Sequence, residues 1–146
     1  MNNIRNLSIF LLRVTIGWYL FYSGLSKVLD KSWTAAGFLN SAKTFPGLYS
    51  WFASAGNIGW INFINEWGML LIGIALILGI FVRWAALGGI LLMALYYFPG
   101  LVFPYVPGGH GFVVDEHIIY IAAFLVLITT HAGSHWGLDK FWRGKI

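Results

Sequence analysis

Four long apolar segments dominate the pattern of hydrophobic and polar positions along the chain. They cover about residues 7–29, 60–82, 84–103 and 112–132. Each is close to the ~20 residues that a helix needs to cross the ~30 Å hydrocarbon layer of a membrane. None shows the period-two alternation of a membrane barrel strand, so each is predicted to be a helix. The pattern therefore predicts an all-α fold, a four-helix transmembrane bundle, in a single domain over residues 1–146.

The connections between these segments differ in character. The first is rich in aromatic residues and glycine, and its pieces TAAGFLNSA and LYSWFASAG predict short interfacial helices. Two interpretations stay open for it: a cap packed over the bundle, or a lid over a site. The second connection is only FVRW, which predicts an antiparallel helical hairpin. The third, FPGLVFPYVPGGHGFVVDEH, is rich in proline and glycine and is expected to be irregular.

Composition supports a membrane location and limits the chemistry. Hydrophobic residues make up 59% of the chain and charged residues 10%, whereas soluble domains carry about 25% charged residues. Because the chain has no cysteine, it cannot form disulfides or hold an iron–sulfur cluster through its own thiolates. Redox chemistry would need a bound small molecule or a partner. The chain has no run of basic residues that would indicate nucleic-acid binding.

The first segment has a weakly positive start that is compatible with a signal peptide. Its length and the lack of an A-x-A site directly after it favour a retained helix. With four crossings, both termini and the second connection share one side of the membrane. That side carries Arg5, Arg83, Lys140, Arg143 and Lys145, against Lys27, Lys31 and Lys43 on the other. The positive-inside rule then predicts a multi-pass protein of a prokaryotic-type cytoplasmic membrane with both termini in the cytoplasm.

Glu66 stands at the front of the uncharged run 67–82 and needs an explanation, because ionisable groups inside a membrane are costly. In the predicted orientation, Glu66 and Lys27 lie at one level near the outer surface. Further groups expected at this level are Asp115, Glu116, His117 and His110. One interpretation is a Glu66–Lys27 ion pair that locks two helices together. The other is a polar pocket that exchanges protons with a quinone head group, with Glu66, Lys27 and His117 as catalytic residues.

Small residues on the first segment suggest close packing or binding on one helical face. Arg13, Gly17 and Gly24 recur there at helical spacing, and glycines admit a neighbouring helix or a flat ligand. Arg13 is expected near the end of the fourth segment. One interpretation is a snorkelling side chain that contacts a lipid headgroup or the Asp139 carboxylate, and the other is an anion-binding site. The candidate cofactor-binding residues are Arg13, Gly17, Gly24, Asp115 and Glu116.

Haem and metal ions are not expected. The first three segments contain no histidine, which disfavours a bis-histidine haem within the chain. His131 and His135 have metal-ligand spacing, but Asp139 is the only further ligand nearby.

Three stretches resemble the DoxX family of membrane proteins. LLRVTIGWYLFYSGLSKVLD is similar to the family's first helix, EWGMLLIGIALILGIFVRWAALGGILLMA to its second and third, and VDEHIIYIAAFLVLITTHAGSHWGLDKFW to its fourth. The positions that match the recurring pattern are Arg13, Gly17, Gly24, Lys27, Glu66, Gly68, Gly79, Arg83, Asp115, Gly137 and Asp139. The resemblance implies a four-helix membrane bundle.

The aromatic first connection and the proline-rich third connection look like the DoxD side of this family. That branch resembles the membrane subunit of thiosulfate:quinone oxidoreductase, which oxidises thiosulfate to tetrathionate and reduces a quinone. The resemblance thus implies a membrane-embedded, quinone-interacting oxidoreductase component with quinone as cofactor. Lys27, Lys31 or Lys43 would attract the thiosulfate dianion from the outer side.

A second hypothesis is a non-catalytic membrane subunit that anchors or helps to assemble a soluble or membrane redox partner. A small-molecule carrier is less favoured, because the sequence has no inverted repeat or pair of broken helices. Membrane lipid is an expected partner, and a homo-oligomer remains open.

Overall fold

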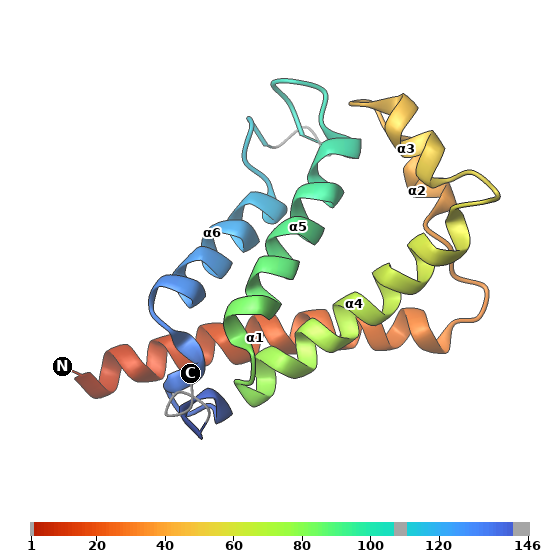
Figure 1. Cartoon of the computed structure of the whole chain (residues 1–146). Coiled ribbons are helices and arrows are strands. Elements are labelled where there is room, and N and C mark those ends of the chain that lie inside the picture. Colours follow the sequence, from red (N-terminus) through yellow and green to blue (C-terminus); the bar gives the residue numbers. More distant parts are fainter. Residues whose placement is uncertain (1, 107–110, 142–146) are drawn as a thin grey trace.

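Figure 1 shows the computed structural model of the chain, which describes residues 2–106 and 111–141. These residues form six α-helices and two short 3₁₀ helices, and they contain isolated β-bridges but no strand. The elements are α1 (Asn2–Leu29), α2 (Ala36–Asn40), α3 (Pro46–Phe52), α4 (Ile58–Leu78), α5 (Val82–Gly100), α6 (Glu116–Thr129), η1 (Ala132–Ser134) and η2 (Leu138–Phe141). The predicted all-α class is confirmed.

Three of the helices, α1, α4 and α5, are long and apolar enough to cross a membrane, so the chain is a multi-pass membrane protein. The expected fourth span is a shorter apolar helix. With 14 residues, α6 measures about 21 Å at 1.5 Å per residue. It starts late because the Asp115 side chain caps it. It ends early because His131 adopts a left-handed conformation with φ of 49°.

The helices form two pairs rather than one even bundle. The most extensive contacts join α1 to α4 and α5 to α6. In Figure 1, α4 and α5 meet at a short turn and diverge toward the opposite end, where α2 and α3 lie. The main core fills the region where the pairs meet. Its fully buried members include Leu20, Leu76, Ala86, Phe124 and Leu127.

Glycines allow α1 and α4 to touch along their backbones. A Cβ atom added at Gly24 would lie 2.7 Å from the Cα of Leu70, and one added at Gly73 would lie 2.6 Å from the Cα of Phe21. At Gly17 it would lie 3.0 Å from the backbone nitrogen of Ile77. Gly17 and Gly24 therefore contact a neighbouring helix. The space beside these two glycines is filled by the α4 backbone.

The segment with α2 and α3 is a packed cap at the divergent end. Leu39, Ala42 and Tyr49 form a small core there. Three hydrogen bonds tie the cap to α5 and the residue after it: Lys43 N to Pro99 O at 2.8 Å, Thr44 Oγ1 to Leu101 O at 2.6 Å, and Tyr49 Oη to Leu95 O at 3.0 Å. Burial raises the pKa of Tyr49, which keeps its phenol protonated as a donor.

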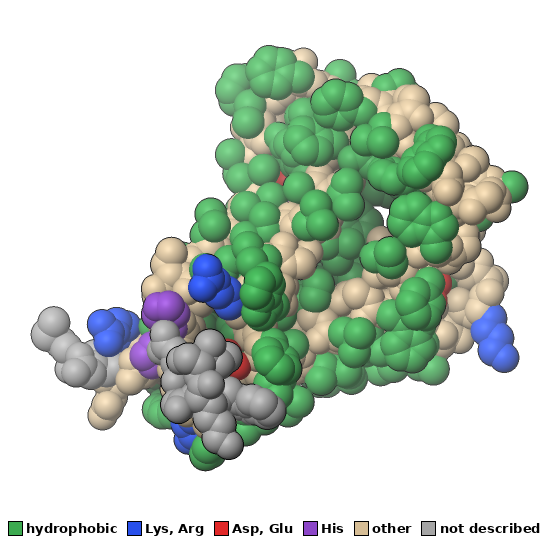
Figure 2. Space-filling model, viewed as in Figure 1, with side chains coloured by type: hydrophobic (Ala, Val, Ile, Leu, Met, Phe, Trp, Pro, Cys, Tyr) green, Lys and Arg blue, Asp and Glu red, His purple; other side chains and the backbone are tan. Residues whose placement is uncertain are grey.

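Polar side chains concentrate at the two ends of the molecule. Apolar side chains cover most of the face drawn in Figure 2, while arginine, lysine and histidine side chains lie toward its ends. The start of α1, the α4–α5 turn and the segment after α6 share one end (Figure 1). The cap and the start of α6 lie at the other end.

Candidate functional site

The ammonium group of Lys27 is the centre of a polar cluster at the cap end, near the end of α1. Its Nζ donates to Asn65 Oδ1 at 2.8 Å, to Tyr96 Oη at 2.8 Å and to Met69 Sδ at 3.2 Å. Tyr96 donates in turn to Asn65 Oδ1 at 2.7 Å. Residues from α1, α4 and α5 thus meet at one half-buried cation.

Aromatic rings cover this cation. Lys27 Nζ lies 4.6 Å from the ring centroid of Trp33 and 5.2 Å from that of Tyr96, within the range of cation–π attraction. A tight turn after α1 positions Trp33: its N–H donates to Asp30 O at 3.0 Å, and Ser32 donates to the Asp30 carboxylate. The Ser32 hydrogen bonds hold the pKa of Asp30 below its usual value, so this carboxylate remains an acceptor at neutral pH.

Glu66 does not form the predicted ion pair. In the described chain, no Lys27–Glu66 contact falls within 4.0 Å, and Glu66 acts on Lys27 only through longer-range attraction. The reason is helical geometry. Adjacent residues point about 100° apart on a helix, and Asn65 occupies the position that faces Lys27.

His117 and Asp115 join the cluster through Tyr96. The rings of Tyr96 and His117 stack with centroids 5.9 Å apart. His117 Nδ1 lies 2.7 Å from Asp115 Oδ2, and Asp115 also accepts from the backbone N–H groups of His117 and Ile118. Asp115 is therefore first a helix cap. Glu116 is solvent-exposed in the first turn of α6, and His110 lies outside the described residues.

An apolar cavity of about 260 Å³ opens beside this cluster, between the cap and the diverging helices α4 and α5. Asn65 and Tyr96, two of the three residues bonded to Lys27, form part of its wall. The remaining lining is apolar or aromatic: Ala35, Phe38, Leu39, Tyr49, Phe52, Trp60, Ile61, Ile64, Leu91, Leu92 and Leu95.

A second polar cluster, at the opposite end, surrounds Arg13. This side chain is fully buried, so it does not snorkel. Its Nη1 donates to Ala132 O at 2.7 Å and His135 O at 3.1 Å, and its Nη2 donates to Trp136 O at 3.2 Å. The sequence correctly placed Arg13 near the end of the fourth helix, although backbone carbonyls are its direct partners.

Asp139 balances the charge of Arg13 without touching it. Its carboxylate accepts the N–H groups of Phe81 at 2.7 Å and Val82 at 3.2 Å, and its own N–H donates to Gly79 O at 2.8 Å. Gly79 and Gly137 leave room for the guanidinium, since a Cβ on Gly79 would lie 2.7 Å from Nη1. This arrangement fastens the C-terminal segment to the α4–α5 turn.

The described residues contain no group of three or more His, Asp or Glu side chains suited to a metal ion. His135 Nε2 lies 3.2 Å from Thr130 O, and Asp139 is engaged at the α4–α5 turn.

Sequence reasoning missed Asn65, Met69, Tyr96 and Trp33. A usable signal existed for two of them. Asn62, Asn65 and Met69 recur at three- and four-residue spacing, which places them on one face of α4, and polar residues within an apolar helix tend to face the protein interior. Tyr96 and Trp33 gave no comparable pattern.

These features define a small multi-pass helical membrane protein with a buried polar cluster at each end. The DoxX family model matches residues 8–100. Since that range is more than half of the chain, the protein belongs to the DoxX family. The matched range runs from within α1 to the end of α5 and therefore includes Lys27, Asn65 and Tyr96, while α6 lies beyond it. No match was found among curated proteins or solved structures.

Proposed function

We propose that this protein is a quinone-interacting component of a membrane oxidoreductase, similar to the membrane subunit of thiosulfate:quinone oxidoreductase. The observation that carries the proposal is the 260 Å³ apolar cavity with Asn65 and Tyr96 in its wall. Ligand sites of this kind combine an apolar slot with a few fixed polar groups. The cavity replaces the predicted Gly17/Gly24 face as the binding surface.

The size and donors of the cavity fit a quinone ring. A dry cavity of about 150 Å³ holds a benzene ring, so about 260 Å³ accommodates a substituted one. A quinone carbonyl needs a hydrogen-bond donor. The Nδ2 group of Asn65 has no hydrogen-bond partner in the described part of the chain, and Lys27 and Tyr96 fix the orientation of this amide by donating to its Oδ1.

The cavity wall also provides access from lipid. Ile64, Leu91 and Trp60 line the cavity and are themselves exposed by 55%, 63% and 44%. In a transmembrane protein, exposed apolar side chains contact lipid tails. An isoprenoid tail attached to a ring in this cavity would leave between α4 and α5 into the bilayer.

A quinone supplies two-electron chemistry coupled to the uptake of two protons. The residues of this chain would orient the ring and deliver protons. Lys27 and Tyr96 hold protons beside the cavity. The His117–Asp115 pair, stacked on Tyr96, is placed to take up a proton at the aqueous end. Glu66 keeps the region electrostatically favourable for the Lys27 cation.

The electron donor in this proposal is thiosulfate or a partner that oxidises it. Lys31 and Lys43 are exposed near the cap and would attract an anionic donor. The proposed orientation places this end outside the cytoplasm, with both termini inside, in a prokaryotic-type membrane. A redox subunit or a second copy of this chain would then dock at the cap end.

The proposal is tested by quinone binding to the purified full-length protein. A short-chain benzoquinone and menadione, titrated against tryptophan fluorescence, should quench Trp33 and Trp60 in the wild type. Lys27→Met and Tyr96→Phe should weaken binding about tenfold, because each removes a hydrogen bond that orients the Asn65 amide toward the ligand. Lys31→Met removes an exposed lysine of the same end and should bind like the wild type. Equal binding by all four proteins would refute the proposal.

A second candidate function, a structural subunit without catalysis, is favoured by one observation. All three donor positions of the Lys27 ammonium are satisfied within the chain, by Asn65, Tyr96 and Met69. If the cluster only locks helices together, Lys27→Met should lower the unfolding temperature while quinones leave that temperature unchanged in every variant. A stable stoichiometric partner on native gels would then support the anchor role.

A further inference from the structure

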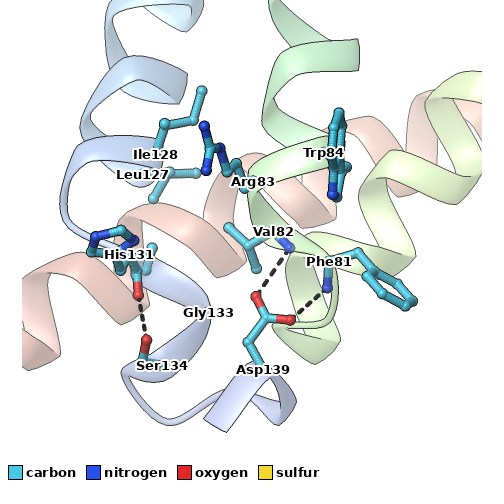
Figure 3. A pocket seen from close by; sticks show the side chains of 11 residues that line it. Phe81, Val82, Arg83, Trp84, Leu127, Ile128, His131, Gly133, Ser134 and Asp139 are labelled. Carbon is cyan, nitrogen blue, oxygen red and sulfur yellow. Dashed lines mark hydrogen bonds between the residues drawn. The ribbon is translucent and has the colours of Figure 1, made fainter. Parts of the chain in front are cut away.

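A second cavity, of about 530 Å³, lies at the end opposite the cavity that Asn65 and Tyr96 line. It opens between the start of α5 and the end of α6, and Figure 3 shows the residues around it. Its wall combines Arg83, Trp84 and Val82 from α5 with Leu127 and Ile128 from α6. His131, Ser134 and Asp139 add polar groups from the segment that follows α6.

The lining of this cavity contains a basic side chain, Arg83, that no acidic side chain of the described chain pairs. Arg83 is exposed, and its guanidinium makes no hydrogen bond or ion pair with any residue of the described chain. In Figure 3 its side chain extends from α5 toward α6, with His131 on the segment beyond. Asp139 is the one acidic residue in the described lining. Its carboxylate already accepts two backbone N–H groups and lies near the buried Arg13.

Exposed aromatic side chains at the rim of the cavity indicate that it lies at headgroup depth. Phe81 and Trp84 border it and are exposed by 55% and 71%. Exposed aromatic residues at a helix end are typical of the membrane–water interface. Beyond them the lining becomes apolar, with Leu127 and Ile128 leading along the α5–α6 groove.

A basic group at the interface joined to an apolar groove matches one class of molecule. We propose that this cavity binds the headgroup phosphate of an anionic phospholipid, with Arg83 and His131 as the polar contacts and the acyl chains along α5 and α6. A free inorganic anion would use the charge but not the apolar wall. The bound lipid would hold α5, α6 and the C-terminal segment together at the end fastened by Arg13 and Asp139.

Native mass spectrometry of the full-length protein in mild detergent tests this site, with equimolar phosphatidylglycerol and phosphatidylcholine added. The wild type should retain phosphatidylglycerol preferentially. Arg83→Gln should lose this preference about fivefold, the change expected for one basic side chain near an anionic lipid, and His131→Gln should reduce it as well. Arg83→Lys should keep part of it, because the charge remains.

Arg5→Gln is the matched control, since Arg5 is exposed at the same end but does not line the cavity. Circular dichroism verifies that each variant is folded. The proposal is overturned if Arg83→Gln retains the wild-type preference, or if Arg5→Gln loses as much. It is also overturned if millimolar inorganic phosphate displaces the lipid, which would indicate a site for free anions.

Discussion

Replacing Arg13 with methionine should be among the most damaging single changes to this protein. Three backbone carbonyls, those of Ala132, His135 and Trp136, accept from the guanidinium at 2.7, 3.1 and 3.2 Å. Methionine has similar length but no donor, so these acceptors lose their partner and the Asp139 carboxylate loses its compensating charge. Leaving a buried acceptor without its partner costs about 1–3 kcal/mol, so three such acceptors should together cost about 3 kcal/mol or more.

The assay is unfolding of the purified protein in mixed micelles, with tryptophan fluorescence as the signal. Arg5→Met on the same helix provides the control, because Arg5 is exposed and surface substitutions change stability by about 0.5 kcal/mol or less. Arg13→Lys should be intermediate, since it keeps the charge but loses the planar fork that reaches several carbonyls. A loss below about 1 kcal/mol for Arg13→Met would refute the view that this cluster fastens the C-terminal segment.

Two further substitutions test the packing of the helices. Gly24→Ala should cost about 1–3 kcal/mol, because the added methyl group meets the α4 backbone. At Gly68 on α4, an added methyl group meets no atom within 4 Å, so Gly68→Ala should be neutral or stabilising by up to about 1 kcal/mol. An unfolding titration in which Gly24→Ala is the more stable of the two variants would contradict the α1–α4 contact. Asp115→Ala should cost about 1 kcal/mol through loss of the α6 cap, and hydrogen exchange should increase at the first turn of α6. Unchanged exchange there would show that the cap is dispensable.

The sequence was sufficient to predict the long helices because their apolar character depends on local composition. The exception is instructive. The apolar run after the third connection suggested a helix from residue 112, yet the helix begins at Glu116. An aspartate directly before an apolar run is a helix-start signal, but the sequence prediction used Asp115 only as a charged group of the site. Val113, with φ of 64°, cannot continue a helix backward.

The hydrogen-bond partners of Lys27 could not be predicted, because they depend on helix rotation, which a single sequence does not reveal. Helix length predicted that Glu66 lies near the level of Lys27, but the rotation of α4 about its axis decides whether residue 65 or 66 faces α1. That rotation is set by the contacts of Gly24 and Gly73 with the opposite backbone. The place of Tyr96 depends further on how α5 leans away from α4, which follows from tertiary packing such as the contact of Gly89 with Phe124.

The divergence of α4 and α5 has a mechanical consequence. The two helices are fixed at the turn, where Asp139 binds Gly79, Phe81 and Val82, and α5 has about 30 Å of length beyond it. A change of about 5° in their angle would therefore move the far ends by roughly 2.5 Å at that length. The apolar cavity lies at this far end. The cap is hydrogen-bonded to α5 there, through Tyr49 and Leu95. Because the turn is fastened, a small angular displacement of the two helices would change the width of this cavity far more than the spacing of the helices at the turn.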